Sequence, residues 1–86
     1  MEIKKELVKR EIAGDVILVP VGKTVYETNG LFVLNELGAF IWDLLEDASD
    51  AEEICRAVLE NYEVSEEEAR NDVREFLAKL EEMHIL

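Results

Sequence analysis

The side chains that could perform chemistry are few and lie far apart in the chain. There is one histidine, His84, and one cysteine, Cys55. A catalytic site needs a nucleophile with a base, a pair of tuned carboxylates or a set of metal ligands. The sequence places no second ligand near His84, so we expect a surface or partly packed histidine. A single cysteine excludes an internal disulfide and a zinc site built from several cysteines.

Cys55 falls on the apolar face of a predicted helix. A reactive thiolate favours a helix N-terminus or cationic neighbours. A free cysteine among apolar residues usually behaves as a small buried hydrophobe. Arg56 is adjacent in sequence but points to another side of the helix, so we predict a structural role for Cys55.

Three runs of acidic residues could be mistaken for catalytic or metal-binding sites. They are Glu52-Glu53, residues 66–68 and Glu81-Glu82. The first two fall in the opening turns of predicted helices, where the helix macrodipole favours negative charge. We expect all three to be solvated, and no glycine belongs to a dinucleotide or phosphate-binding motif. The sequence therefore predicts neither catalytic residues, nor a metal site, nor a cofactor.

The charge balance limits the partners of the chain. Nine basic and twenty-one acidic residues give a net charge of −12. Nucleic acids and acidic membranes both attract cationic proteins, so both are disfavoured as partners. The charge either serves solubility alone or favours a basic or neutral protein or peptide, and the composition leaves both open. The opening "MEIKKELVKREI" lacks the apolar core of a signal peptide, and no apolar run is long enough to span a membrane, so we expect a cytoplasmic protein.

The first part of the chain is predicted to form a small antiparallel sheet. Two strand-like runs lie within residues 7–21, separated by a hairpin turn at residues 13–15. Pro20 marks the end or the edge of the second strand, because it cannot donate a ladder hydrogen bond. The segment "KTVYETNG", residues 23–30, could add a short extended piece that ends in an Asn-Gly turn. Residues 31–34 form the third strand.

The rest of the chain is predicted to form three helices, which gives one α+β domain over residues 1–86. Asn35 is the expected N-cap of the first helix. Ser49 with Glu52, and Ser65 with Glu68, have the spacing of capping boxes at the starts of the other two. We expect Trp42 to cover the edge of the core and the terminal Ile-Leu pair to fold back onto it. The predicted apolar stripes are Leu37, Phe40, Ile41, Leu44 and Leu45; Ala51, Ile54, Cys55, Val58, Leu59 and Tyr62; and Ala69, Val73, Phe76, Leu77, Leu80 and Met83.

The third strand is apolar on both faces. Phe32 and Leu34 point one way, and Leu31 and Val33 the other. A core needs only one of these pairs. If this strand lies at a sheet edge, its free backbone groups can pair with an added peptide strand.

The third helix also carries surplus apolar surface. Leu77 falls to one side of the central stripe, beside Arg70 and Arg74. These arginines could meet carboxylates of an incoming peptide. Equally, they could pair with acidic residues of their own helix, namely Glu66, Glu67 or Asp72.

At this point the chain resembles the PqqD-like proteins, also called RiPP recognition elements. The resemblance rests on "ILVPVG", on "GLFVLNELGAFIWDLLED" and on the segment from "AEEICRAVLENYEV" to "EEMHIL". It covers about residue 11 to residue 86. The order and spacing of many core residues carry it, because no single motif is diagnostic.

The resemblance implies a winged helix-turn-helix-like fold of three strands followed by three helices, without catalysis. Such proteins bind the leader segment of a ribosomally made precursor peptide and deliver it to a modifying enzyme, often a radical S-adenosylmethionine enzyme. The leader would add as a strand beside the third strand, in a groove closed by the third helix. The implied peptide-binding residues are Leu31, Phe32, Val33, Leu34, Arg70, Val73, Arg74 and Leu77.

The connection at residues 21–30 is longer than the resemblance to the quinone-cofactor branch implies, which favours a relative that serves another peptide pathway. Two other functions stay open: an adaptor subunit of an enzyme complex, and a DNA-binding winged helix suggested by fold analogy alone. An open sheet edge is compatible with a monomer and with a strand-exchanged dimer.

Overall fold

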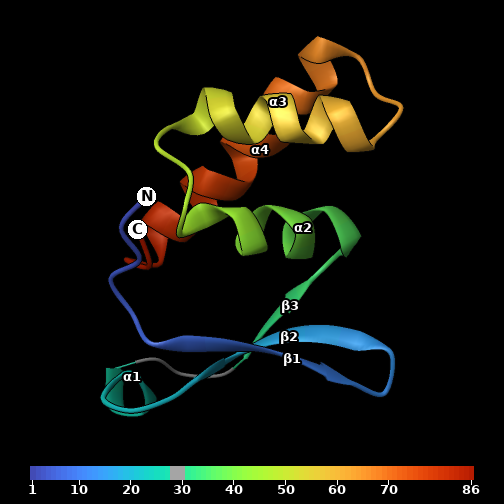
Figure 1. Cartoon of the computed structure of the whole chain (residues 1–86). Helices are drawn as coiled ribbons and strands as arrows, with labels where there is room; N and C mark the ends of the chain where they lie inside the picture. The colour runs from blue at the N-terminus through green and yellow to red at the C-terminus, as the bar shows by residue number, and fades with distance from the viewer. Residues whose placement is uncertain (28–30) are drawn as a thin grey trace.

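The computed structural model describes residues 1–27 and 31–86 of the chain, so the predicted Asn29-Gly30 turn lies outside the described residues. Within these ranges the chain forms three strands and four helices, which follow one another as shown in Figure 1. The elements are β1 (Leu7–Ile12), β2 (Asp15–Pro20), α1 (Thr24–Glu27), β3 (Phe32–Leu34), α2 (Glu36–Leu45), α3 (Ala51–Asn61) and α4 (Glu66–Glu82).

β1 and β2 form the predicted hairpin. They pair antiparallel from Leu7 opposite Pro20 to Ile12 opposite Asp15, which leaves a two-residue loop. Both loop residues have positive φ, 52° at Ala13 and 87° at Gly14. Two successive residues with positive φ give the turn whose twist matches that of the flanking strands. The predicted hairpin and the end of β2 at Pro20 are confirmed, but Asp15, predicted in the turn, is the first residue of β2.

β3 lies at one edge of the sheet, whose order is β1-β2-β3. It pairs antiparallel with β2, with Leu34 opposite Val16 and Phe32 opposite Leu18. Leu18 and Leu34 are buried, whereas Val33 keeps 66% of its surface exposed. The two faces of β3 therefore differ as the alternation predicted.

The segment after β2 differs from its prediction. Residues 24–27 form the short helix α1 instead of an extended piece. Gly22 has a positive φ of 58°, which turns the chain, and the following amides donate to carbonyls three residues earlier. The Thr24 side chain is buried and its hydroxyl accepts a hydrogen bond of 2.7 Å from the Glu6 amide. This contact with the start of β1 outweighs the strand preference of the local sequence, so the helices number four and not three.

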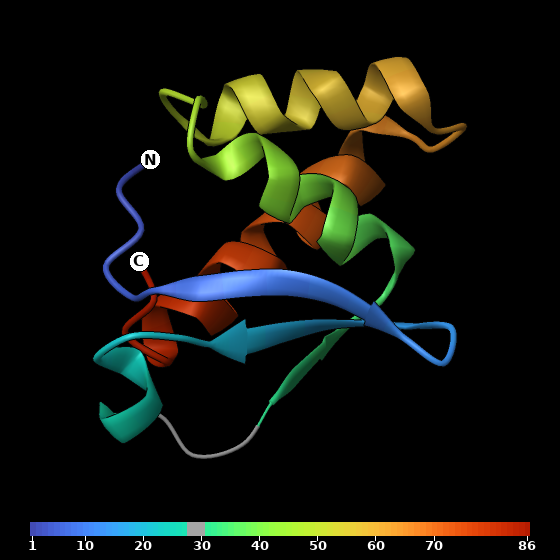
Figure 2. The same ribbon diagram turned by 60° about the horizontal axis from the view of Figure 1, so that its bottom comes forward.

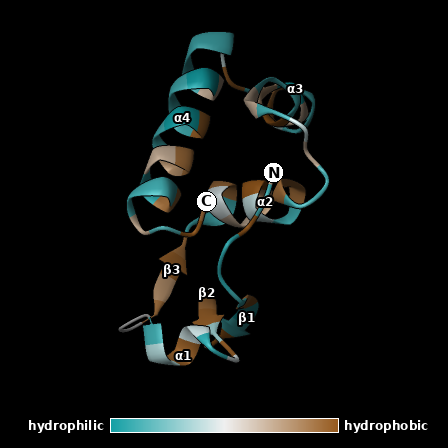
Figure 3. Cartoon of the chain, turned by 90° about the vertical axis from the view of Figure 1, so that its left-hand side faces the viewer, coloured by the Kyte–Doolittle hydropathy of each residue, from teal (hydrophilic) through white to brown (hydrophobic). Residues whose placement is uncertain are grey.

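The longer helices lie on one side of the sheet (Figure 1). α2 lies over one face of the sheet, and α3 and α4 pack together beyond it (Figures 1 and 2). α4 runs from α3 towards the sheet and ends near β3, as Figure 3 shows from the side. The α+β class predicted from the sequence is confirmed.

Side-chain caps fix where the helices begin. The Asn35 side chain accepts from the Gly38 amide at 2.7 Å, and the Ser65 hydroxyl accepts from the Glu68 amide at 3.1 Å, so both predicted N-caps are confirmed. The predicted box of Ser49 with Glu52 is wrong by one residue. Asp50 accepts from the Glu53 amide at 3.0 Å, and the Glu53 carboxylate accepts from the Ser49 amide at 3.2 Å.

The core lies between the sheet and the helices. It includes Trp42, which is 9% exposed and thus belongs to the core instead of covering its edge. The chain end folds back as predicted: Ile85 is fully buried, and its carbonyl accepts from the Lys4 amide at 2.7 Å. No helix in the described ranges is long and apolar enough to cross a membrane. The buried apolar residues are Leu18, Leu34, Ile41, Trp42, Leu45, Ala48, Ile54, Cys55, Val58, Ala69, Val73, Leu77, Leu80 and Ile85.

Candidate functional site

A hollow of about 300 Å³ separates β3 from the C-terminal half of α4. We call it the apolar hollow, because most of its lining is apolar. Phe76, Leu80 and Met83 recur at helical spacing, which places them on one face of α4. β3 supplies the opposite wall. The lining residues are Leu18, Leu31, Phe32, Val33, Leu34, Asn35, Phe76, Lys79, Leu80 and Met83.

The backbone of β3 borders the apolar hollow. One edge of β3 pairs with β2, and no strand within residues 1–27 and 31–86 pairs with its other edge. An unpaired edge offers N–H and C=O groups to an added strand. A peptide on this edge would place alternate side chains towards the helices and into the hollow. Figure 3 shows that β3 is hydrophobic along its length.

A second hollow, of about 250 Å³, continues the first towards the start of α2. We call it the acidic hollow, because it contains two carboxylates. Asn35, Phe76 and Lys79 line both hollows, so the two hollows adjoin, and we call them together the groove. The full lining of the acidic hollow is Asn35, Leu37, Gly38, Ile41, Asp72, Glu75, Phe76 and Lys79.

Gly38 sets how closely α2 and α4 approach at this place. A Cβ atom at position 38 would lie 3.2 Å from the Phe76 ring and 3.1 Å from the Asn35 side-chain oxygen. Both distances are tighter than ordinary van der Waals contact. The absence of a side chain therefore lets the Phe76 ring rest against the first turn of α2.

The structure brings together half of the site residues predicted from the sequence. Leu31, Phe32, Val33 and Leu34 all line the apolar hollow. The α4 residues Arg70, Val73, Arg74 and Leu77 are not among those that line either hollow. Val73 is completely buried and Leu77 is 7% exposed, so Leu77 is a core residue and not an uncovered shoulder.

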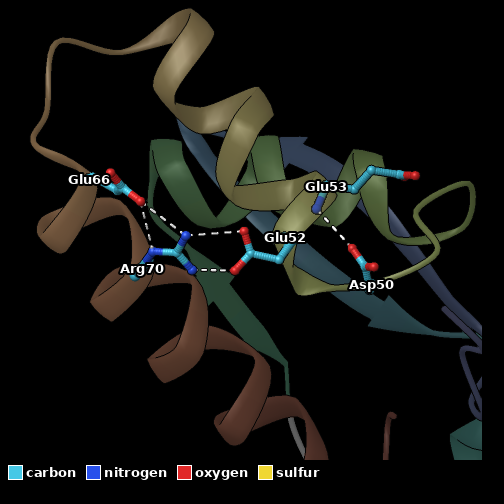
Figure 4. A network of polar contacts seen from close by, with 5 residues as sticks. All are labelled: Asp50, Glu52, Glu53, Glu66 and Arg70. Atoms are coloured by element: carbon cyan, nitrogen blue, oxygen red, sulfur yellow. Dashed lines mark hydrogen bonds and ion pairs between the residues drawn. The ribbon is translucent and has the colours of Figure 1, made fainter.

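Arg70 is held by carboxylates of its own chain (Figure 4). Its guanidinium donates to Glu66 on α4 at 3.0 Å, and it forms a two-pronged contact with Glu52 on α3. The hydrogen bond from Arg70 lowers the pKa of Glu52, and the two carboxylates raise the pKa of Arg70. Of the two alternatives left open for Arg70, pairing within the protein is the one observed.

Sequence reasoning missed Lys79 as a residue of the groove. The sequence predicts Phe76, Leu80 and Met83 in the apolar stripe of α4 but does not indicate them as peptide-binding residues. Phe76 and Met83 are only partly buried. The order of the elements could have shown this, because the last turns of α4 must return to the sheet for the terminal Ile-Leu pair to be buried.

The described residues outside the groove show no arrangement suited to catalysis. His84 is exposed, and burial raises the pKa of the Cys55 thiol, which makes it a weak nucleophile at neutral pH. No three His, Cys, Asp or Glu side chains within the part of the chain that the structure describes could together hold a metal ion.

Comparison with known proteins identifies the family. The family model described as "Coenzyme PQQ synthesis protein D (PqqD)" matches residues 15–86. The chain belongs to the PqqD family. Thus the family resemblance inferred from the sequence is confirmed. No curated protein sequence matches the chain.

Two solved structures are similar to this PqqD family member. One is TbiB1 in complex with the TbiA(beta) leader peptide, at 31% identity and a TM-score of 0.77, covering 100% of this chain and 94% of that chain. The other is lasso peptide synthetase B1 complexed with the leader peptide, at 20% identity and a TM-score of 0.72, covering 94% and 89%. The second supports the fold alone.

Proposed function

We propose that this protein binds the leader segment of a ribosomally made precursor peptide by strand addition at β3, and presents it to a modifying enzyme without performing catalysis. The observation that carries the proposal is the unpaired edge of β3 beside the apolar hollow. Membership of the PqqD family and the likeness to TbiB1, solved with a leader peptide, support it.

Strand addition accounts for both walls of the groove. Backbone hydrogen bonds to β3 would provide affinity that depends little on sequence, and side chains that enter the hollow would provide selectivity. Phe32 and Met83 are partly buried and pack against the core from opposite walls. An apolar peptide side chain placed between them would remove apolar surface from water, at about 25 cal/mol for each Å².

We further propose that the partner is a radical S-adenosylmethionine enzyme or another peptide-modifying enzyme, and that the protein acts in the cytoplasm. Of the site residues proposed from the sequence, those of β3 and the preceding Leu31 are retained. On α4, the positions of Phe76, Lys79 and Met83 make them stronger candidates for peptide contact than Arg70, Val73, Arg74 and Leu77.

Strand addition can be tested with modified peptides. A random peptide library displayed on phage, together with the TbiA(beta) leader peptide as a known probe, would supply ligands. Each backbone nitrogen of the best binder would then be methylated in turn. In an added strand, alternate residues direct their N–H groups to the neighbouring strand. We expect methylation to weaken binding at every second position of the paired segment.

Hydrogen exchange provides the second measurement. The amides of residues 31–34 should become protected when the peptide binds, while those of β1, at the other sheet edge, should not change. Binding without alternation in the methylation series, or failure to obtain any peptide that protects β3, would contradict the proposal. A precursor processed equally well by its enzyme with and without this protein would contradict the presenting role.

A further inference from the structure

The acidic hollow has a different charge pattern from the apolar hollow. Asp72 and Glu75 lie three residues apart on α4, which places their carboxylates on the same side of the helix. Both side chains are exposed, and neither forms an ion pair with another residue of the described ranges. Among the described residues that line the two hollows, Lys79 is the one basic residue. With two carboxylates and one ammonium group, the lining of the acidic hollow carries a net charge of −1.

The walls between these charged groups are apolar. Leu37, Ile41 and the ring of Phe76 line the same hollow as the carboxylates. A lysine or arginine side chain matches this combination, because its stem is apolar and its head is cationic. A cation close to an aromatic ring is attracted by the ring face. Carboxylates at the same place add charge-assisted hydrogen bonds.

The field of the whole protein acts in the same direction. Residues 35–86 contain sixteen acidic and four basic residues and so carry the entire net charge of −12, whereas residues 1–34 contain five of each. The acidic hollow is formed entirely by residues of the charged part. A concentration of one sign of charge raises the local concentration of ligands with the opposite sign.

The alternative is that the acidic hollow binds an acidic side chain of the peptide. The start of α2 borders the acidic hollow, and the start of a helix favours anions. However, the Asn35 side chain already accepts from the Gly38 amide there. Arg70 lines neither hollow, and its guanidinium is already paired with the carboxylates of Glu52 and Glu66. The balance of charges in the groove therefore favours a cationic ligand group.

We propose that the acidic hollow is a subsite for a basic side chain of the bound peptide, held by Asp72 and Glu75 over Phe76. This inference rests on the proposed function and adds to it the class of peptide recognised. The peptide carries an apolar side chain in the apolar hollow and a lysine or arginine at a fixed spacing from it, on the side of Asn35.

The test compares peptide selections against three proteins with the same phage-displayed random library. The first is the wild type. The second carries Asp72→Asn and Glu75→Gln. The third is the matched control with Glu67→Gln and Glu82→Gln, which removes two negative charges from exposed positions of α4 that line neither hollow.

We expect lysine or arginine to be enriched at one spacing from an apolar residue with the wild type and the control, but not with the Asp72→Asn, Glu75→Gln protein. Replacing that basic residue by methionine in a selected peptide should weaken binding to the wild type about tenfold, the size expected for a charge-assisted contact. The same replacement should change binding to the Asp72→Asn, Glu75→Gln protein less than about twofold, because the partner groups are absent.

The outcomes separate this inference from the function on which it rests. Peptides that protect the β3 amides but show no basic preference, or an acidic one, would overturn the subsite and leave leader binding intact. A basic preference that survives the double substitution would also overturn it. If no selected peptide protects β3, the proposed function itself fails. Circular dichroism would confirm that each variant is folded.

Discussion

The two halves of α4 carry similar apolar residues but face different surroundings. In the first half, Ala69 and Val73 are completely buried, and Arg70 forms an ion pair with Glu52 of α3. In the second half, Phe76 and Met83 are only partly buried and line the groove beside β3. Surplus apolar surface therefore occurs where α3 no longer covers α4.

This difference assigns separate tasks to the two halves. We call the first half of α4, which contains Ala69, Arg70 and Val73, the closed half, and the second half, which contains Phe76 and extends to the C-cap Met83, the open half. The closed half contributes to stability through burial and through the contact with α3. The open half leaves side chains available to a ligand. A stripe of apolar residues shows which face of a helix is hydrophobic. It does not show which part of that face, along the helix axis, is covered by a neighbouring element. Substitutions in each half can test whether stability and binding are separable.

The largest expected effect is loss of stability on Val73→Ala. Val73 is completely buried in the closed half, so removal of two methyl groups takes away apolar burial and leaves a cavity. We expect the free energy of unfolding to fall by about 2 kcal/mol. Urea denaturation followed by circular dichroism measures it.

The matched control is Met83→Ala in the open half, which should cost less because Met83 keeps exposed surface. At a temperature where both variants are folded, Val73→Ala should keep the peptide affinity of the wild type. A Val73→Ala protein that is stable but binds peptide poorly would show that the two halves do not have separate tasks.

The second expected effect is loss of peptide affinity on Phe76→Ala. The Phe76 ring lines both hollows, so its removal takes away a wall of each. We expect affinity for a selected peptide to fall at least about tenfold, the size expected for an aromatic residue at the centre of an interface. Fluorescence anisotropy with a labelled peptide measures it.

Arg70→Ala is the control from the closed half, and it should change the affinity by less than about twofold, as for a residue that lies outside the contact surface. A larger effect of Arg70→Ala than of Phe76→Ala would place the peptide against Arg70, one of the contacts that the family resemblance implies.

The sequence predicted the fold better than the site, and particular residues show why. Asn35, Ser65 and the Ala13-Gly14 turn act through neighbours in the chain, so their types and spacing were sufficient. α1 was missed because a contact of Thr24 with Glu6, distant in sequence, fixes that segment.

The helical wall of the site was misplaced for a similar reason. Periodicity placed Arg70 and Leu77 beside each other on one flank of α4. It could not show that the guanidinium of Arg70 forms an ion pair with Glu52 of α3. The β3 wall could be predicted, because strand alternation alone shows that a doubly apolar strand has one apolar face to spare. Contacts between elements that are distant in sequence thus determine the conformation of α1 and the position of the helical wall, which local sequence patterns do not predict.

A smaller effect is expected at the end of the open half. His84 follows the C-cap of α4 with a positive φ of 61°, and the Ile85 amide donates to the Leu80 carbonyl at 2.8 Å. This arrangement usually contains glycine at the position of His84, because other residues pay a steric penalty there. We expect His84→Gly to raise the free energy of unfolding by about 1 kcal/mol.

Thermal or urea denaturation measures the change, and the peptide affinity should stay within about twofold of the wild type because His84 does not line the groove. The control is Ala78→Gly, at an exposed position of α4 that lines neither hollow, which places glycine inside the helix and should reduce stability by about 1 kcal/mol. A His84→Gly protein that is less stable than the wild type would show that the His84 imidazole stabilises the fold by more than the positive φ at this position costs.

The smallest expected effect is the pH dependence of the closed half. The hydrogen bond from Arg70 lowers the pKa of Glu52 in the folded protein. The unfolded chain therefore takes up a proton at Glu52 before the folded protein does as pH falls. Stability from this pair is present above the ordinary pKa of glutamate and is lost as pH falls through the lowered value. Because both side chains are exposed, solvent and salt weaken the effect.

The wild type should consequently be more stable than Glu52→Gln at neutral pH, and the difference should vanish in acid and shrink in high salt. Glu60→Gln, another exposed position on α3, controls for the loss of one negative charge. Carboxyl NMR should give Glu52 a titration midpoint below that of an ordinary glutamate, which returns to the ordinary value in Arg70→Ala. An unshifted midpoint in the wild type would mean that Arg70 is not held in solution, and that the closed half of α4 could open to a ligand after all.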